Sequence, residues 1–420
     1  MKSAIVVDAE HAEIWGDEHM NTTVAGTPTL AADFTITRSR ADAIPWYAWT
    51  SVLATVCIST GLYWDISWHM TIGRDTFWTP AHLLIQFGAV LGGSAAAVLI
   101  FGTTFGRSAD GRASSVRILG LWGPLGAFLS AWGAAAMLIS APFDNWWHNN
   151  YGLDVKIISP PHQLLGVGIE SINFGGIILM VGLLNHAQGA LRRHLQWMML
   201  TVGGLVLCNS MMGRLEFTDR AMMHSAAMYL GLAIGPPFVM ETVARATGLR
   251  WARTTMAALY TIFFLLAVWI FPLFAAEPKL APVYQHITHM IPLGFPVLLL
   301  GPAIALDLLW RKLNAREPTP GFEDKWLQAT AAGVVFVAAL VAAQWPFADF
   351  LMSPASRNWV FGTLNHPYMV PPEWFGVRNL FKPFEGMGPF AIRMALAVFA
   401  ATMCTRLGIM FGNWMRKVQR

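Results

Sequence analysis

The chain has 420 residues, of which 55% are apolar and only 12% are charged, about half the charged share of ordinary soluble domains. This composition excludes a soluble globular protein, and a net charge of +4 without a basic block argues against a nucleic-acid partner. The apolar residues form continuous runs, so we predict an all-α, polytopic transmembrane helix bundle in a lipid bilayer. The cysteines Cys57, Cys208 and Cys404 lie in these runs and are expected to be small buried residues.

A helix crosses the bilayer with roughly twenty mostly apolar residues. Ten predicted spans meet this length, in chain order 46–64, 80–104, 118–142, 160–184, 195–213, 221–244, 254–276, 287–310, 326–346 and 388–410. We expect a polar cytoplasmic tail at 1–45 and a metal-site helix bundle at 46–185. The remainder, 186–420, is predicted to be an additional transmembrane bundle with an outer loop at 347–387.

Basic residues are concentrated in alternate loops and at the C-terminus. They are Arg107, Arg112, Arg117, Arg192, Arg193, Arg245, Arg250, Arg253, Arg311, Lys312, Arg316, Lys325, Arg416, Lys417 and Arg420. Because cytoplasmic loops carry the excess of Lys and Arg, both termini are predicted to be cytoplasmic. Most histidines then fall at the outer side, namely His69, His82, His148, His162, His224, His286, His289 and His366. We therefore expect a functional site at the outer face.

Two segments at that face repeat one pattern. Residues 64–84 read WDISWHMTIGRDTFWTPAHLL, and residues 144–165 read DNWWHNNYGLDVKIISPPHQLL. Both contain Asp-x-x-Trp-His, then Gly-x-Asp, then Pro-x-His-x-Leu, with one residue inserted in the second copy. Each copy joins two predicted spans, so the chain contains an internal repeat that presents polar side chains at the membrane surface.

The spacing within each copy brings three metal-ligand types together. Asp65 and His69 are four residues apart and share one face of a helix. Thr79 and Pro80 resemble the N-cap and first residue of the next helix, which places His82 in its first turn. The second copy repeats this arrangement with Asp144, His148, Ser159, Pro160 and His162. Two imidazoles and a carboxylate suit copper, iron or zinc and leave open positions for a small ligand.

These residues resemble the ligand segments of the C subunit of copper membrane monooxygenases, the particulate methane and ammonia monooxygenases. The first match consists of Asp65, Trp68, His69, Arg74, Asp75, Thr76, Thr79, Pro80 and His82. The second match consists of Asp144, His148, Pro160 and His162. Asp144 stands where that family has Asn, and the resemblance covers roughly residues 46–185, so the chain has several more spans than the family's C subunit.

The resemblance implies copper held by Asp65, His69 and His82, and a neighbouring site at His148 and His162, to which we add Asp144. It implies a subunit of a monooxygenase that activates dioxygen and hydroxylates a small apolar substrate or ammonia. It also implies A- and B-type partner subunits, a quinol electron donor and a bacterial inner membrane. Asp75 and Asp154 are expected to accept hydrogen bonds from ligating histidines.

Two other interpretations stay open. One is a membrane copper-handling protein, for transport or delivery, without oxygenase activity; outer Met and His clusters and the additional spans favour it. The other is a structural subunit with a degenerate site, which the completeness of both triads argues against.

Several residues outside the triads are further candidates. Glu170 is a mid-membrane carboxylate that either relays protons or bonds to Asn173. Glu216, Asp219 and His224 cluster near methionines, and His286 with His289 would share a face at the start of the span 287–310. For these clusters a third metal site stands against ordinary packing and hydrogen bonding.

Overall fold

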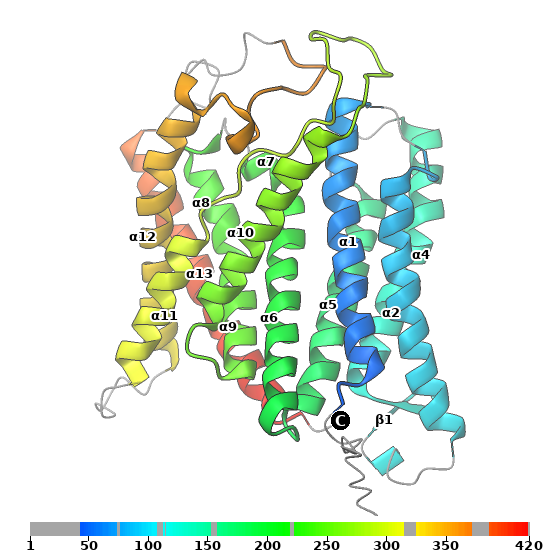
Figure 1. The fold of residues 1–420 in the computed structure, drawn as a ribbon. Helices are drawn as coiled ribbons and strands as arrows, with labels where there is room; N and C mark the ends of the chain where they lie inside the picture. Colours follow the sequence, from blue (N-terminus) through cyan, green and yellow to red (C-terminus); the bar gives the residue numbers. More distant parts are fainter. Residues whose placement is uncertain are drawn as a thin grey trace, which may run out of the picture. The chain divides into compact units, whose positions relative to one another are not determined.

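Long helices fill most of the predicted apolar stretches and pack side by side in the computed structural model (Figure 1). The structure describes residues 43–73, 76–106, 112–113, 115–152, 158–218, 222–314, 325–371 and 386–418. The longer helices are α1 (Trp46–Thr71), α2 (Pro80–Phe105), α4 (Leu125–Tyr151), α5 (Pro160–Leu184), α6 (Gly189–Met212), α8 (Ala226–Ala233), α9 (Pro236–Thr247), α10 (Ala252–Ile270), α11 (Leu300–Asn314), α12 (Lys325–Leu351) and α13 (Met387–Met415). The short elements are β1 (Val116–Ile118), β2 (Leu121–Gly123), α7 (Leu215–Thr218), η3 (Phe271–Leu273), η4 (Pro354–Ser356) and η5 (Trp359–Phe361).

Eight described stretches are long and apolar enough to cross a membrane: α2, α4, α5, α6, α8 with α9, α10 with η3, α12 and α13. The prediction of an all-α polytopic bundle is therefore confirmed, and the chain is a multi-pass membrane protein. α1 has the same length as α2 but carries more polar side chains. α11 has only 15 residues, fewer than the roughly twenty that a complete span needs.

The helices that carry the two triads extend beyond their predicted spans. The first span was expected to end at residue 64, yet α1 continues to Thr71 and includes Asp65 and His69. The third was expected over 118–142, but α4 begins at Leu125 and continues to Tyr151. Ahead of it, β1 and β2 form an antiparallel hairpin whose turn has positive φ at Leu119 and Gly120. Apolarity defines the part of a helix inside lipid, whereas the helix itself continues into the polar interface.

The predicted span over 287–310 is wrong. Residues 274–299 are not helical, and the helix α11 begins only at Leu300. Pro292, Gly294 and Pro296 explain this, because proline removes a helical hydrogen bond and its ring clashes with the preceding turn. Backbone groups in this segment need other partners inside the bundle. They bond to side chains of other helices: Ile291 N donates to Thr71 Oγ1 at 2.7 Å, and Leu298 N donates to Gln344 Oε1 at 2.9 Å.

Small residues allow the triad-bearing helices to pack closely. On α4, a β-carbon added at Gly126 or Gly133 would meet backbone atoms of α5, and one added at Gly168 on α5 would meet α4. Helix pairs in membranes commonly use such residues to bring backbones together. The hairpins α1–α2 and α4–α5 therefore lie side by side (Figure 1), with α2 packed on α4. We call the end of the bundle that carries Asp65, His82, Asp144 and His162 the triad end.

A buried ionic network lies at the opposite end, between α9, α10 and α11. The Arg253 guanidinium donates to Glu241 Oε2 from Nη2 at 2.6 Å and to Asp307 Oδ1 from Nη1 at 2.9 Å. Arg245 donates to Glu241 Oε1 at 2.5 Å and lies over the Trp310 ring. Arg253 was expected in a basic loop, but it is the second residue of α10 and is buried. It neutralises two carboxylates that come from two other helices.

Candidate metal centre

The first triad converges at the junction of α1 and α2. His82 Nε2 lies 3.0 Å from Asp65 Oδ1, and His69 Nε2 lies 3.8 Å from Asp65 Oδ2. One ligand atom from each of the three residues lies within 4.8 Å of the others. Ligands about 2.0–2.2 Å from a single ion are themselves separated by roughly 3–4 Å. The side chains therefore need only a small adjustment to hold one metal ion.

The His82 ring is oriented for coordination through Nε2. Its Nδ1 lies 3.0 Å from the carbonyl oxygen of Thr76. A carbonyl only accepts, so Nδ1 carries the hydrogen, and in the neutral ring Nε2 presents a lone pair. That lone pair faces the Asp65 carboxylate, an arrangement that requires a proton or a metal cation between the two atoms. A second hydrogen bond that fixes the tautomer of a histidine is typical of metal ligands.

The second triad repeats this design at the junction of α4 and α5. His148 Nε2 lies 3.4 Å from Asp144 Oδ2, and His162 Nε2 lies 3.6 Å from Asp144 Oδ1. The His148 Nδ1 lies 3.1 Å from the carbonyl oxygen of Gly152, which again leaves Nε2 for a cation. Ser159 contacts His162 Nδ1 at 3.0 Å and accepts from its backbone N–H, so it caps α5 as predicted.

The two triads differ in how tightly they converge. Within the part of the chain that the structure describes, only Asp65, His69 and His82 bring three such ligand atoms within 4.8 Å of one another. In both triads the two imidazoles face different oxygens of the aspartate, but in the second triad the three ligand atoms do not all come within that distance. A single ion there would require the Asp144 carboxylate or a ring to move further. The first triad is therefore the better preorganised site.

Backbone carbonyls contact the rings of His82 and His148, and the expected role of the carboxylates Asp75 and Asp154 stays a prediction. The histidine N–H groups of His82 and His148 bond to Thr76 and Gly152, whereas Asp75 and Asp154 lie outside the described residues. The Gly-x-Asp repeat marked the right loops, but a carbonyl acceptor leaves no sequence signature. Thr79 is the N-cap residue of α2 and Pro80 its first residue, as predicted, although the Thr79 Oγ1 accepts from Thr76 N at 3.0 Å and makes no side-chain cap bond to α2.

A small pocket of about 340 Å³ lies between the two hairpins. It is lined by Thr76, Phe77 and Trp78 from the loop of the first triad, and by Pro142 and Asn145 on α4 beside Asp144. Aromatic and proline surfaces make most of its wall apolar, and Thr76 also positions the His82 ring. The pocket is therefore of a size and composition for a small apolar molecule next to both triads.

Segments from the second half of the chain cover the end of α1 beside the first triad. Tyr368 N donates to Met70 O at 3.2 Å, and Lys279 N donates to Ile72 O at 3.0 Å. The Tyr368 side chain is buried, and burial raises the pKa of its hydroxyl, so the group stays neutral. Tyr368 belongs to the predicted outer loop 347–387, so part of that loop lies next to the first triad.

Gly73 gives this contact a testable consequence. Its φ is +79°, and an added β-carbon would overlap the Tyr368 hydroxyl. We expect Gly73→Ala to lose about 1–3 kcal/mol from backbone strain alone, and to displace Tyr368 and weaken metal retention at the first triad. Thermal unfolding and metal content of the purified variant measure both effects. Gly120→Ala is the control, because Gly120 has φ +85° with open space around it; equal losses in both variants would contradict a role for Tyr368.

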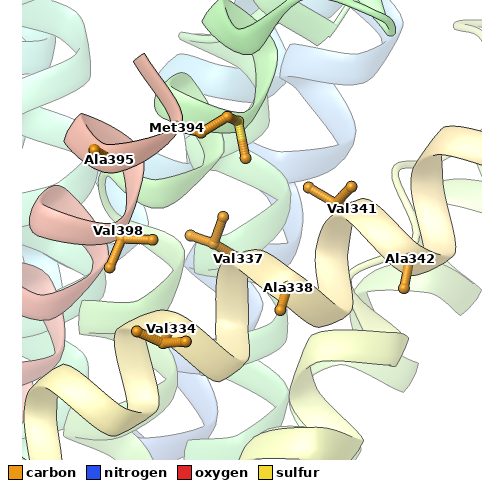
Figure 2. Close-up of a pocket in the computed structure, with 8 residues that line it drawn as sticks. All are labelled: Val334, Val337, Ala338, Val341, Ala342, Met394, Ala395 and Val398. Carbon is orange, nitrogen blue, oxygen red and sulfur yellow. The ribbon is translucent and has the colours of Figure 1, made fainter. Parts of the chain in front are cut away.

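A larger groove lies away from the triads. Figure 2 shows it between α12 and α13, with a volume of about 530 Å³. Its lining consists of Val334, Val337, Ala338, Val341, Ala342, Met394, Ala395 and Val398. It therefore offers no hydrogen-bonding side chain or metal ligand, and we assign no chemistry to it.

Among the described residues, neither of the other predicted clusters brings three metal ligands together. His286 and His289 lie in the non-helical segment and so do not share a helix face; His289 instead contacts Thr288 Oγ1. His224 Nε2 lies 3.3 Å from Asp349 Oδ1 on α12, a partner that sequence spacing could not identify. Met211, Met212 and Met223 are buried in the core, which is the ordinary packing role. The Glu216 side chain and Asp219 lie outside the described residues.

Comparison with protein-family models, with curated proteins and with solved structures finds no match to this chain. The resemblance to copper membrane monooxygenases therefore rests on the residues of the two triads and their spacing. It stays a prediction.

Proposed function

We propose that this protein is a subunit of a copper-dependent membrane monooxygenase that uses dioxygen to hydroxylate a small apolar substrate or ammonia. The observation that supports it most is the convergence of Asp65, His69 and His82, with the His82 ring held by Thr76. Imidazole and carboxylate ligands with open positions suit copper, and bound copper would supply one-electron chemistry and reactivity toward dioxygen. The second triad would hold a further ion through His148, His162 and Asp144.

The protein's own residues would bind the metal ion, orient its ligands and balance its charge. The Asp65 carboxylate lies between two imidazoles, and its negative charge favours binding of a metal cation at this point. The Thr76 carbonyl fixes the direction of the His82 Nε2 lone pair. The side chain of His69 is 44% exposed, so the first site is accessible from solvent. Phe77, Trp78 and Pro142 would bind the substrate beside the triads and exclude water from it.

Orientation and partners form part of the same proposal. Basic residues such as Arg117, Arg192 and Arg311 lie in elements at the end of the bundle opposite the triads. The positive-inside rule then places that end and both termini in the cytoplasm, and both triads at the outer face of a bacterial inner membrane. By resemblance, A- and B-type subunits would be the partners and a quinol the electron donor.

Metal analysis of the purified protein tests the proposal. We expect copper in the wild type, and each of His69→Ala and His148→Ala to lose the copper held by its own triad. Loss should be larger for His69→Ala, since the first triad converges more tightly. Unchanged copper in both variants would refute the proposed sites. Dioxygen consumption that depends on methane, a related small alkane or ammonia would then test the oxygenase itself, in membranes that contain the whole complex.

Copper handling without oxygen chemistry is the second candidate. Two observations favour it: the non-helical residues 290–299, most of which are buried in the bundle, and the interruption between α8 and α9. Broken helices at membrane depth are typical of transporters. Copper uptake into sealed vesicles, without substrate-dependent dioxygen consumption, would support this candidate over the first.

A further inference from the structure

The stretch that contains α8 and α9 is interrupted in its middle. Residues Ala226–Thr247 have the length and apolarity of one span, but Ile234 is extended and Gly235 has φ +101°. Pro236 and Pro237 follow and lack the N–H groups that would continue the hydrogen bonds of α8. The last carbonyls of α8 lie about 12 Å from the start of that helix, at membrane depth, and need hydrogen-bond donors other than the helix itself.

Arg214 supplies those partners. It follows the end of α6, and its Nε donates to Gly231 O at 2.9 Å. Its two Nη groups donate to the carbonyls of Ile234 and Ser210. A β-carbon at Gly235 would clash with the guanidinium. The carbonyls at the C-terminal end of a helix carry partial negative charge, so the break itself stabilises the arginine charge.

Among the acidic side chains that the structure describes, Glu170 is the one whose charge interacts with this arginine. It lies on α5, eight residues beyond His162 and about 12 Å deeper along the helix. It interacts electrostatically with Arg214 and lies beside Asn173. Its Oε2 is buried and makes no hydrogen bond. Cys404 on α13 is the other titratable side chain that interacts with Arg214.

Glu170 differs from every other acidic side chain in the described helices. Glu241 and Asp307 are bonded to Arg253. Asp349 is paired with His224, and the two triad aspartates are paired with histidines. Of the acidic side chains that the structure describes in helices, which do not include that of Glu216, Glu170 alone makes no ion pair at contact distance. A carboxyl group at membrane depth is expensive and usually has a function.

Buried polar groups with spare hydrogen-bonding capacity lie on the helices around it. Ser59 Oγ on α1 and both amide atoms of Asn209 on α6 are buried and unpartnered, and the buried Asn173 side chain on α5 lies against the Glu170 carboxyl. Two hydrogen bonds show which residues of neighbouring helices lie at the same depth. Thr55 on α1 donates to Asn173 Oδ1 on α5 at 3.0 Å, and Tyr63 on α1 donates to Cys208 O on α6 at 3.4 Å. Ser59 lies midway between Thr55 and Tyr63 on α1, so it lies about 6 Å along the axis from each bonded level.

From this arrangement we propose that Glu170 is a proton-exchanging carboxyl of a membrane-embedded site, with Arg214 as its counter-charge and Ser59, Asn173 and Asn209 as the polar side chains that carry water to it. A proton from water binds the carboxylate and leaves again to water, so charge and atoms balance. The site accommodates both the ionised and the protonated carboxyl of Glu170, because the α8 carbonyls still stabilise Arg214 when Glu170 is neutral. Glu241 and Asp307 differ, since each is bonded directly to Arg253.

This inference does not depend on the triads holding copper. Glu170 is not a triad residue, and protonation of its carboxyl is measurable in metal-free protein. Failure of the copper experiment and failure of this one are therefore separate results.

Dicyclohexylcarbodiimide, which modifies protonated carboxyls in apolar surroundings, provides the first test. The full chain in lipid is treated with the reagent, and adducts are located by peptide mass spectrometry. We expect Glu170 to be modified at least about tenfold more than Glu241 or Asp307, which are buried but ion-paired controls in the same sample. Modification should fall as the pH is raised. Equal modification of the three side chains would overturn the proposal.

Infrared spectroscopy provides a second test, which does not require the reagent to reach the site. We expect a carboxylic C=O band that disappears in Glu170→Gln, remains in Glu241→Gln and shifts in heavy water. The heavy-water shift distinguishes an exchanging proton from one locked in a structural hydrogen bond. A band missing from the wild type, or one that does not shift in heavy water, would overturn the proposal even if the adduct were found.

Discussion

Replacing Asp65 by alanine is expected to abolish tight copper binding at the first triad. Asp65 contacts both histidines, through Oδ1 to His82 and Oδ2 to His69, so the change removes one ligand and the charge that draws the imidazoles together. Loss of a group that only orients a ligand lowers metal affinity by roughly 10–100-fold. Loss of the ligand itself should lower it by more than about 100-fold, measured by competition with a copper chelator of known affinity.

Asp144→Ala is the matched variant at the second triad. Its three ligand atoms do not all lie within 4.8 Å of one another, so the wild-type site is expected to be weaker and its loss to affect only the later copper that binds. Asp144→Asn, which restores the residue of the resembling family, should retain the second site. Equal effects of Asp65→Ala and Asp144→Ala on the first copper to bind would contradict the difference in preorganisation between the two triads.

Replacing Arg253 by leucine is expected to cause the largest loss of stability. The substitution leaves Glu241 and Asp307 buried at 2% and 0% exposure without their shared cation. Breaking a buried ion pair by removing one partner costs about 3–5 kcal/mol. Glu241 keeps its bond to Arg245, whereas Asp307 keeps only the N–H and hydroxyl of Thr254, each at 2.8 Å, neither of which supplies a positive charge. Unfolding in mixed detergents, followed by circular dichroism, measures the change.

Two control variants separate charge burial from the loss of an arginine as such. Arg311→Leu lies at the same end of the bundle, and among the described residues the exposed Arg311 contacts the Trp251 ring; we expect a change of about 1 kcal/mol or less. The triple variant Arg253→Met, Glu241→Gln, Asp307→Asn removes all three charges and should recover most of the stability. A triple variant as unstable as Arg253→Leu would show that packing, and not unpaired charge, causes the loss.

The helical membrane fold and the grouping of each triad could be predicted from the sequence because both depend on residues near one another in the chain. Continuous apolar runs fix where helices cross lipid, and Asp65 with His69 share a face through four-residue spacing. The proline-marked start of α2 returns His82 to the same place. The error at 287–310 arose because average apolarity outweighed Pro292 and Pro296, which prevent a helix there.

Contacts between distant parts of the chain were decided by tertiary structure alone. Arg253 and Asp307 are 54 residues apart, and neither position alone reveals that the other neutralises it. The pairing of His224 with Asp349, the placement of Tyr368 over Gly73 and the insertion of Arg214 into the α8–α9 break have the same origin. Local spacing selects which side chains share a helix face. Only the packing of helices determines which faces meet. At those contacts a buried charge or carbonyl without a partner costs free energy, so the folded structure pairs it with a group from a distant part of the chain.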